Sequence, residues 1–434
     1  MNAALKSNFF DMVHKIVLNT SVQIIGKIIS LVLSIATIAL LTRSLGLTGY
    51  GEFTLAFSYV SFFGLFTDFG LQLTVIRELG ENLETRPTVY GTFFALKMAL
   101  VFVSICLALI CMLFFPYDLS MKMAIILASI TVALGNLNGF PTAIFQYKLR
   151  LDIITFGDVL AKVVTFIFIF LGAFYFHSVY YMISAVLIGN FFLIIYSFLF
   201  LHKLGVKKFL FKRSLVFDLI RFSLPVGAAS FFSLAAIQVA TIILSIRSGT
   251  QAVGVYSLSY KFIDNILIIW GFYMASIYPL LSQLRGNKDS VNTGRIITGS
   301  VFFAVASSLP AIGIGVVFAP LVVYIFGGGH FAASILPLRI LLFSLPFAFL
   351  NNFFYHVLIL DKRYKALIYS FAVKFILIVF ANFIIIPQWG YTGTASIAVF
   401  SELFLSLYLF FYTNSVHHLS WRENMNSLLA KIHI

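Results

Sequence analysis

Charged side chains are scarce in this sequence. Asp, Glu, Lys and Arg make up 10% of its 434 residues, whereas hydrophobic residues make up 61%. A soluble globular domain carries about 25% charged residues, so this composition excludes an ordinary soluble protein. Apolar runs of about 20 residues, each long enough for a membrane-spanning helix, recur along the chain. Because the short alternating segments of a membrane barrel are absent, the sequence predicts an all-α, polytopic membrane protein.

Cysteine and the common catalytic motifs are also rare or missing. The two cysteines, Cys106 and Cys111, lie in one apolar run, which argues against a structural disulfide and against a metal site. The sequence has no Walker A motif, HExxH, GxSxG or Cys/His cluster, so it predicts no ATP-hydrolysing motor. We therefore expect a protein that is not an enzyme and that carries no cofactor.

What the chain has instead is a series of apolar runs joined by basic connections. The connections on one side of the membrane hold about 19 lysines and arginines, and those on the other side about three. By the positive-inside rule, both termini are predicted to be cytoplasmic. The net charge of +14 then reflects topology, and no nucleic acid is expected as a partner. About twelve spans are predicted, at residues 20–42, 52–76, 88–114, 121–145, 152–175, 179–201, 219–246, 253–282, 295–326, 334–360, 366–386 and 391–413.

A weak internal repeat divides the chain into halves. The stretch Lys27–Glu78 has a copy 203 residues later, in which Gly51 falls on Gly254. Both halves are predicted to begin on the same side, which makes them parallel repeats. The predicted organisation is a six-helix bundle with an interfacial lead-in helix (1–202), a basic cytoplasmic linker (203–218), a second six-helix bundle (219–413) and an interfacial tail (414–434).

Ionisable side chains inside the predicted spans are the best candidates for a functional site. Each costs roughly 2.5–3.5 kcal/mol at the centre of a membrane helix, so we expect these groups to pair or to line a water-filled cavity. About six basic residues stand against four acids, which predicts a cationic cavity and an anionic passenger. The residues are Lys27, Lys97, Lys162, Lys261, Arg339 and Lys374, with Asp68, Asp158, Asp264 and Glu402.

Two roles are predicted within this set. The candidate substrate-binding residues are Lys27, Lys97, Lys261, Lys374 and Arg339. The candidate ion-coupling residues are Asp68, Asp264 and Glu402, because desolvation helps a carboxyl group to exchange a proton. Polar stripes support a common cavity. In the second span, the stripe is predicted to comprise Thr54, Ser58, Ser61, Asp68 and Gln72.

Several of these charges also have a purely structural interpretation. Lys261 and Asp264 are three residues apart and can neutralise each other on one helix, as can Asp158 and Lys162. Arg339 lies near a span end and can extend its guanidinium to the interface. Three residues have no oppositely charged neighbour on their own helix and need a partner on another helix or water: Asp68, Lys374 and Glu402.

Short motifs in nearly the whole chain resemble those of one transporter group. They are residues 41–46 (LTRSLG), 49–53 (GYGEF), 68–71 (DFGL), 77–78 (RE), 254–258 (GVYSL), 386–395 (IPQWGYTGTA) and 401–402 (SE). Their order and spacing resemble the polysaccharide-export branch, which includes O-antigen flippases, of the multidrug/oligosaccharidyl-lipid/polysaccharide flippase superfamily. Asp68 and Glu402 match positions typical of that family. The candidate lysines rest on their depth in the spans and on the polar stripes, and not on the resemblance.

The resemblance implies two six-helix bundles around a cavity that alternates its access between the two membrane faces. It implies a flippase that moves a polyprenyl-pyrophosphate-linked oligosaccharide from the cytoplasmic to the outer leaflet of a bacterial inner (plasma) membrane. The implied pathways make O-antigen, capsule or exopolysaccharide, with a polysaccharide polymerase or ligase as a partner. Coupling to protons or sodium is also implied. Lysine and arginine would suit a pyrophosphate head group.

Three other functions remain open at this point. A drug or cation antiporter of the same superfamily predicts an acidic cavity, against the basic balance of the spans. A membrane glycosyltransferase or polysaccharide polymerase would need sizeable outer loops, and the predicted outer connections are only a few residues long. A lipid scramblase without glycan specificity cannot be separated from a glycolipid flippase by the sequence.

Overall fold

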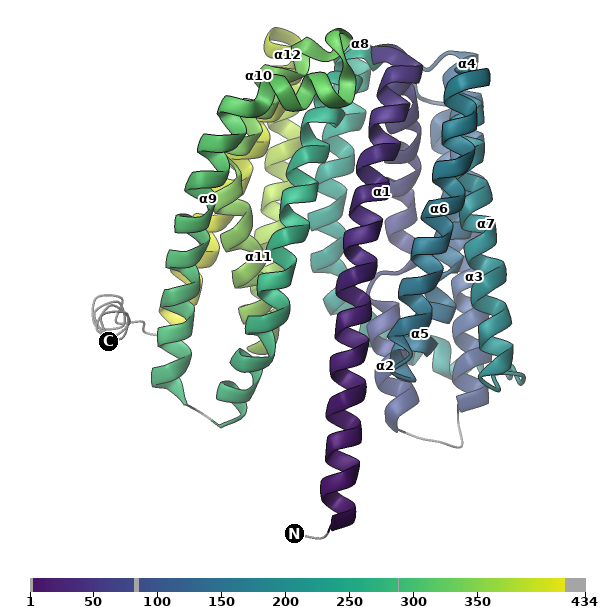
Figure 1. Cartoon of the computed structure of the whole chain (residues 1–434), viewed down its shortest axis with the longest axis vertical. Coiled ribbons are helices and arrows are strands. Elements are labelled where there is room, and N and C mark those ends of the chain that lie inside the picture. The colour runs from purple at the N-terminus through teal and green to yellow at the C-terminus, as the bar shows by residue number, and fades with distance from the viewer. Residues whose placement is uncertain (1–2, 82–85, 288, 418–434) are drawn as a thin grey trace. The chain divides into compact units, whose positions relative to one another are not determined.

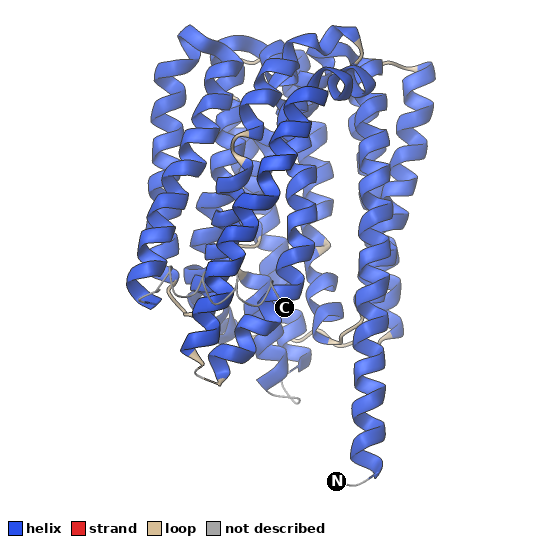
Figure 2. Ribbon diagram, turned by 60° about the vertical axis from the view of Figure 1, so that its left-hand side comes forward, coloured by secondary structure: helices blue, strands red, loops and turns tan. Residues whose placement is uncertain are grey.

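Helices form all the regular structure of the described residues. The computed structural model describes residues 3–81, 86–287 and 289–417 (Figure 1). No strand occurs in these ranges (Figure 2). The chain forms two compact units, unit 1 (Met1–Gly227) and unit 2 (Ala228–Ile434). The predicted all-α architecture is confirmed. The side chains of the predicted lead-in helix, and most of the predicted tail at 414–434, lie outside the described residues.

The helices follow one another with short connections. Unit 1 holds α1 (Ala3–Gly64), the 3₁₀ helix η1 (Leu65–Thr67), α2 (Leu71–Glu81), α3 (Arg86–Met112), α4 (Leu119–Leu137), α5 (Gly139–Tyr147), α6 (Leu151–Tyr175), α7 (Val179–Lys203) and the start of α8 (Arg213–Gly286). Unit 2 holds the rest of α8, α9 (Ser290–Gly327), η2 (Gly329–Ser334), α10 (Ile335–Leu342), α11 (Leu345–Leu360) and α12 (Tyr364–His417).

Many of these helices are suited to a membrane by length and composition. Among the described residues, eight can span a membrane, or nine if η2–α10 and α11, bent by 51°, count as one span. Three apolar segments, Gln23–Gly80, Gly227–Gly286 and Tyr364–His417, are 58, 60 and 54 residues long, far beyond the roughly 20 residues that one crossing needs. The protein is therefore a multi-pass membrane protein, and the number twelve stays a prediction.

Single glycines bend these three long segments. Gly46 (φ 65°), Gly249 (φ 79°) and Gly390 (φ 52°) all have positive φ within otherwise helical stretches. Their φ/ψ combinations are readily adopted only by glycine, which lacks the Cβ that would clash. Gly46 and Gly249 are 203 residues apart, the offset of the sequence repeat. The same turn at equivalent positions supports the predicted repeat.

The second predicted span, 52–76, is wrong as one continuous helix. α1 ends at Gly64, and Phe69 and Gly70 both have positive φ before α2 begins at Leu71. Asp68 therefore does not continue the polar stripe of the preceding helix. Close backbone packing accounts for the break. A Cβ on Gly70 would lie 2.8 Å from the Ser223 carbonyl oxygen, so the start of α8 can approach only a glycine here.

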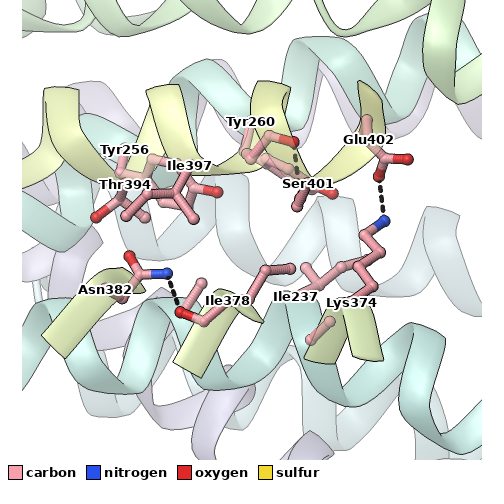
Figure 3. Close-up of a pocket in the computed structure, with 13 residues that line it drawn as sticks. Ile237, Tyr256, Tyr260, Lys374, Ile378, Asn382, Thr394, Ile397, Ser401 and Glu402 are labelled. Carbon is pink, nitrogen blue, oxygen red and sulfur yellow. Dashed lines mark hydrogen bonds and ion pairs between the residues drawn. The ribbon is translucent and has the colours of Figure 1, made fainter. Parts of the chain in front are cut away.

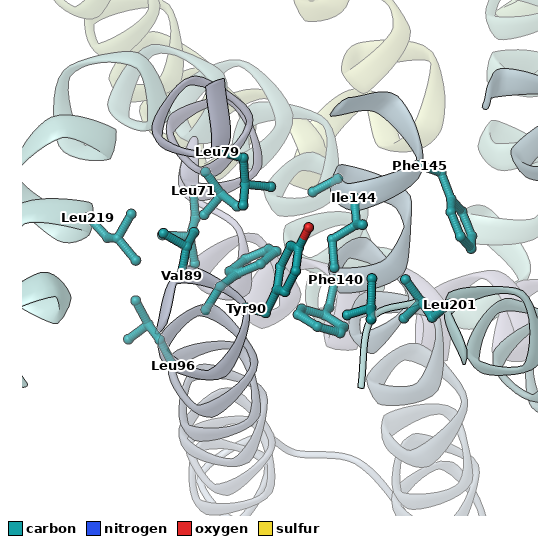
Figure 4. Packing of buried hydrophobic residues seen from close by; sticks show 14 of the residues in the cluster. Leu71, Leu79, Val89, Tyr90, Leu96, Phe140, Ile144, Phe145, Leu201 and Leu219 are labelled. Atoms are coloured by element: carbon teal, nitrogen blue, oxygen red, sulfur yellow. The ribbon is translucent and has the colours of Figure 1, made fainter. Parts of the chain in front are cut away.

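A hydrophobic cluster fixes the end of unit 1 that carries this break. Leu71 and Leu79 of α2 pack with Val89 of α3, Phe140 of α5 and Leu201 of α7 (Figure 4). Each of these side chains is at most 2% exposed. Because lipid is as apolar as a side chain, close packing of this kind, more than transfer out of water, holds membrane helices together. The cluster thus positions α2, α3 and α5 around the segment that contains Asp68.

Unit 2 is held by polar contacts as well as by packing. Two hydrogen bonds join α8 to η2. Ser259 Oγ donates to the Ser334 carbonyl oxygen at 2.8 Å, and Ser334 Oγ donates to the Val255 carbonyl oxygen at 3.0 Å. Between α11 and α12, the buried carboxylate of Asp361 contacts both Arg285 and His417. These contacts join the two ends of α12 and the end of α8.

Candidate functional site

In unit 1, a buried lysine is paired with a carboxylate at the break after α1. Lys97 of α3 is 2% exposed, and its Nζ lies 3.2 Å from Asp68 Oδ1. The same ammonium donates a hydrogen bond to the Thr67 carbonyl oxygen at 3.0 Å. The Asp68 side chain is 45% exposed. A buried ammonium is tolerated only when paired and hydrogen-bonded, and both conditions are met here.

The backbone break creates this binding site for the ammonium. Because η1 ends at Thr67, its carbonyl can accept from a side chain, where a continuing helix would direct it to a backbone N–H. Gly139, at the junction of α4 and α5, leaves the space that the ammonium occupies. A Cβ there would lie 3.2 Å from Lys97 Nζ. Two interrupted helices therefore meet at one lysine.

In unit 2, the second buried lysine pairs with a glutamate on the same long helix. Lys374 Nζ lies 2.5 Å from Glu402 Oε1, and the two side chains are 8% and 21% exposed. Twenty-eight residues of straight helix would separate them by about 42 Å, so the bend at Gly390 brings them together. Asn351 of α11 donates to Glu402 Oε2 at 2.7 Å and to the Glu402 carbonyl at 2.9 Å.

This second ion pair lies between two hollow spaces. A cavity of about 30 Å³ extends from the pair to Asn382 and Thr394 (Figure 3). A larger cavity of about 340 Å³ lies on another side and is lined by Asp264, Trp270 and Asn351, among others. Lys374, Glu402, Tyr260 and Ile237 line both. The small space is large enough for an ordered water, which needs roughly 10–15 Å³ of this volume.

Three residues that line these cavities also carry a buried polar atom without a hydrogen-bond partner. Asn351 Oδ1, Trp270 Nε1 and Asn382 Oδ1 are buried and lack a hydrogen-bond partner. Such atoms are rare in native proteins and commonly mark the place of a water, ion or ligand. Asn351 and Trp270 line the large cavity, and Asn382 lines the small one.

The structure pairs six of the eight candidate residues in three ion pairs, and two of these pairs contain a buried lysine. Each pair joins a predicted substrate-binding lysine to a predicted ion-coupling acid, so the two roles meet at one place. The Lys261–Asp264 pair on α8 is 3.9 Å apart, and its side chains are well exposed. Lys27 on α1 and Arg339 on α10 are exposed, and Arg339 Nε donates to the Val316 carbonyl at 3.2 Å. The assigned roles of all eight stay predictions.

The large unit 2 cavity is not lined mainly by basic residues, although the sequence predicted a cationic cavity. Lys374 is the one candidate cation among its lining residues, against Asp264 and Glu402. Sequence analysis also missed Asn351, although two adjacent asparagines, Asn351 and Asn352, interrupt an otherwise apolar helix and could have drawn attention to it.

Lys162 has contacts other than those considered from its sequence. Its Nζ lies 3.2 Å from Ser34 Oγ and 3.4 Å from the Ser30 carbonyl, both on α1. Ser30 and Ser34 of the first predicted span therefore help to join α1 to α6. Cys106 and Cys111 are both free thiols.

Comparisons with known proteins agree with this architecture. A family model described as "Polysaccharide biosynthesis protein" matches residues 13–285. The chain belongs to this family. A search of curated proteins finds no match. Among solved structures, this family member is similar to the lipid II flippase MurJ in an inward closed conformation, with a TM-score of 0.73 and 15% identity over 94% of this chain and 90% of that chain.

Two other transporters of the MOP superfamily share the fold. An inward-facing multidrug resistance MATE family transporter has a TM-score of 0.74 and 14% identity, over 91% of this chain and 96% of that chain. A MOP superfamily transporter from Pyrococcus furiosus, described as having a reverse polarity of its binding pocket, has a TM-score of 0.67 and 14% identity, over 93% and 95%. The family member therefore has the fold of MOP superfamily transporters, and the resemblance seen in the sequence is confirmed.

Proposed function

We propose that this protein is a flippase that moves a polyprenyl-pyrophosphate-linked oligosaccharide from the cytoplasmic to the outer leaflet of the inner membrane. The observation that carries the proposal is the Lys374–Glu402 pair. It lies in the wall of a 340 Å³ cavity, in a chain of the polysaccharide biosynthesis family with the fold of a lipid flippase. Transport would proceed by alternating access, without ATP hydrolysis, and a polysaccharide polymerase or ligase would receive the product.

The pair offers a simple route to ion coupling. Glu402 now neutralises the ammonium of Lys374. A proton or sodium ion on Glu402 would weaken that attraction and leave Lys374 able to bind an oxygen of the pyrophosphate. Binding of the cation and binding of the anion would then favour each other, and this coupling is reciprocal. The Lys97–Asp68 pair has the same chemistry in unit 1.

The remaining candidates would act around these pairs. Asp264 lines the same cavity as Glu402 and is the second acid proposed for ion coupling. Lys261, Lys27 and Arg339 are proposed as further contacts for the phosphates or for acidic sugars, because their side chains are exposed and carry positive charge. Their removal should weaken transport less than removal of Lys374, whose ammonium is desolvated.

Leaflet transfer in liposomes tests the proposal. The purified protein would be reconstituted with a fluorescent polyprenyl-pyrophosphoryl oligosaccharide, and exposure of the lipid would be followed with and without a proton or sodium gradient. We expect gradient-stimulated transfer by the unchanged protein, transfer without gradient response by Glu402→Gln, and loss of transfer by Lys374→Gln. Arg150→Gln is the control, because Arg150 pairs with Asp152 at 2.8 Å in an exposed ion pair. Unaltered transfer and gradient response in both variants would contradict the proposal.

A cation antiporter is the second candidate, and one observation favours it. The large unit 2 cavity contains two acids, Asp264 and Glu402, against one base. Efflux of a cationic dye from the same liposomes, without transfer of the glycolipid, would replace the flippase by this function. Gradient-independent transfer of ordinary phospholipids at the same rate would indicate a scramblase, and lengthening of the glycan would indicate a polymerase.

A further inference from the structure

The connection between α7 and α8 has a fixed course over unit 1. Residues 206–212 are not helical. The Leu210 N–H donates to the Pro87 carbonyl at 3.0 Å, and the Lys212 N–H donates to Thr92 Oγ1 at 3.0 Å. Gly91 makes the approach possible, since a Cβ there would lie 2.4 Å from the Leu210 carbonyl oxygen. The basic linker is thus attached to the start of α3.

An apolar cavity lies under this connection. Its volume is about 550 Å³, which is within the usual range of about 300–1,000 Å³ for small-molecule sites. The rings of Phe94, Phe140, Phe198 and Phe209 pack against one another with centroids 5.1–6.2 Å apart. Phe140 and Leu201 belong to the unit 1 cluster shown in Figure 4. The cavity is lined by Phe94, Phe198, Leu201, His202, Val206, Lys207 and Phe209.

The lining of this cavity and the linker beside it carry basic side chains. His202 and Lys207 line it and are exposed. Residues 203–213 contain four lysines and one arginine and no acid. Such basic pockets at the ends of membrane helices suit the phosphate of an anionic lipid. The site is at the ends of two candidate spans, because α3 begins at Arg86 and α7 ends at Lys203.

The linker itself has the composition of a segment that enters a lipid surface. Phe209, Leu210 and Phe211 are 45%, 57% and 62% exposed, and they are flanked on both sides by basic residues. Exposed aromatic residues beside lysine and arginine are typical of the membrane interface. The polar side chains of the lining are those of His202 and Lys207, and two basic groups suit a phosphate better than a set of sugar hydroxyls. A phospholipid therefore fits better than a glycolipid.

We propose that this cavity, between α3, α7 and the linker, binds one acyl chain of an anionic phospholipid whose phosphate is held by Lys207. The lysines beside it, Lys203 and Lys208, raise the local concentration of anionic lipid. The bound lipid holds the linker against the membrane and adds an apolar occupant to the end of unit 1. The lining contains no residue of either buried ion pair, and the proposal does not depend on the proposed transport function.

Lipid retention by the full chain tests this proposal. The protein would be purified from phosphatidylglycerol or phosphatidylcholine nanodiscs, and bound lipid would be counted by native mass spectrometry. We expect selective retention of phosphatidylglycerol and about fivefold weaker binding in Lys207→Ala, the effect of one lysine near a lipid surface. Lys365→Ala is the control, because it removes the same charge from another exposed position, in the first turn of α12 next to Lys362 and Arg363. Equal loss in both variants would overturn the site.

Two further measurements distinguish a phospholipid in the cavity from a polyprenyl lipid and from a surface charge effect. Phe209→Ala should weaken binding of phosphatidylglycerol without changing the net charge, because Phe209 lines the cavity and is already partly exposed. A polyprenyl phosphate that displaces phosphatidylglycerol at equal or lower concentration would assign the cavity to the polyprenyl lipid and overturn the proposal. Retention that is unchanged in Phe209→Ala would leave only a surface charge effect and would also overturn it.

Discussion

The two units each bury a lysine against a carboxylate, but the surroundings of the pairs differ. In unit 1, Lys97 is buried and Asp68 is almost half exposed. In unit 2, Lys374 and Glu402 are both largely buried, and Asn351 adds two hydrogen bonds to the glutamate. The unit 1 acid is already in contact with the surroundings of the protein, whereas the unit 2 acid has its polar contacts from Lys374, Asn351 and the adjoining cavity. We therefore expect the two ion pairs to differ in how much stability the protein loses when the lysine or the acid is replaced.

The largest effect is expected in unit 2, where either single substitution leaves a buried charge. Lys374→Met and Glu402→Gln should each lower the free energy of unfolding by about 3–5 kcal/mol. The double variant should lose clearly less than the sum, because both charges are removed together. Unfolding of the purified protein in detergent, followed by tryptophan fluorescence, measures all three. Strictly additive losses would show that the two side chains are not coupled.

In unit 1, the two partners should differ from each other. Asp68→Asn leaves the buried ammonium of Lys97 without its countercharge, at a cost of about 3 kcal/mol. Lys97→Met leaves an exposed carboxylate, which costs about 1 kcal/mol or less. The same unfolding measurement compares them. Equal costs for the two variants would remove the contrast drawn here between the units.

The equivalent bends at Gly46 and Gly249 should respond alike. Alanine at either position is disfavoured by the positive φ and should cost about 1–3 kcal/mol. No atom lies within 4 Å of the added Cβ at either site, so the cost comes from the backbone alone. Gly271→Ala is the matched control on α8: its Cβ also meets no atom, and it should add about 0.4–1 kcal/mol of stability. A gain at Gly249 like that at Gly271 would contradict the assigned turn.

The smallest expected effect is at the start of α9. Asp289 accepts hydrogen bonds from the backbone and side-chain nitrogens of Asn292, and these bonds lower the pKa of its exposed carboxyl. Because the pKa of this carboxyl is lower in the folded than in the unfolded state, its ionised form stabilises the fold at pH values above the unfolded-state pKa. That stabilisation is lost as the pH falls through the folded-state pKa. The protection of the amides in the first turn of α9 against hydrogen exchange should therefore be lower in acid than at neutral pH. Asp289→Asn should lack this response. Asp118, which caps α4 through the Met121 N–H at 3.0 Å, is the unit 1 counterpart for comparison.

Much of the helical layout could be predicted from the sequence because hydropathy and glycine act locally. The apolar runs mark most spans, and Gly46 and Gly249 mark equivalent turns in the two halves. The repeat register, however, says nothing about the charged pairs. Lys97 falls on Ser300 in that register, so the second copy has no lysine at that place. The break after Gly64 was also missed, because it depends on the approach of α8 to Gly70.

Low charge and long apolar runs were enough to predict a helical, multi-pass membrane protein from the sequence. Family motifs added the likeness to flippases. Which charges meet could be seen only in the folded chain. Asp68 and Lys97 are 29 residues apart, and Lys374 and Glu402 are 28 apart, distances at which no helical periodicity brings side chains together. Their pairing depends on where the backbone breaks or folds back, and that is set by packing between segments distant in the chain.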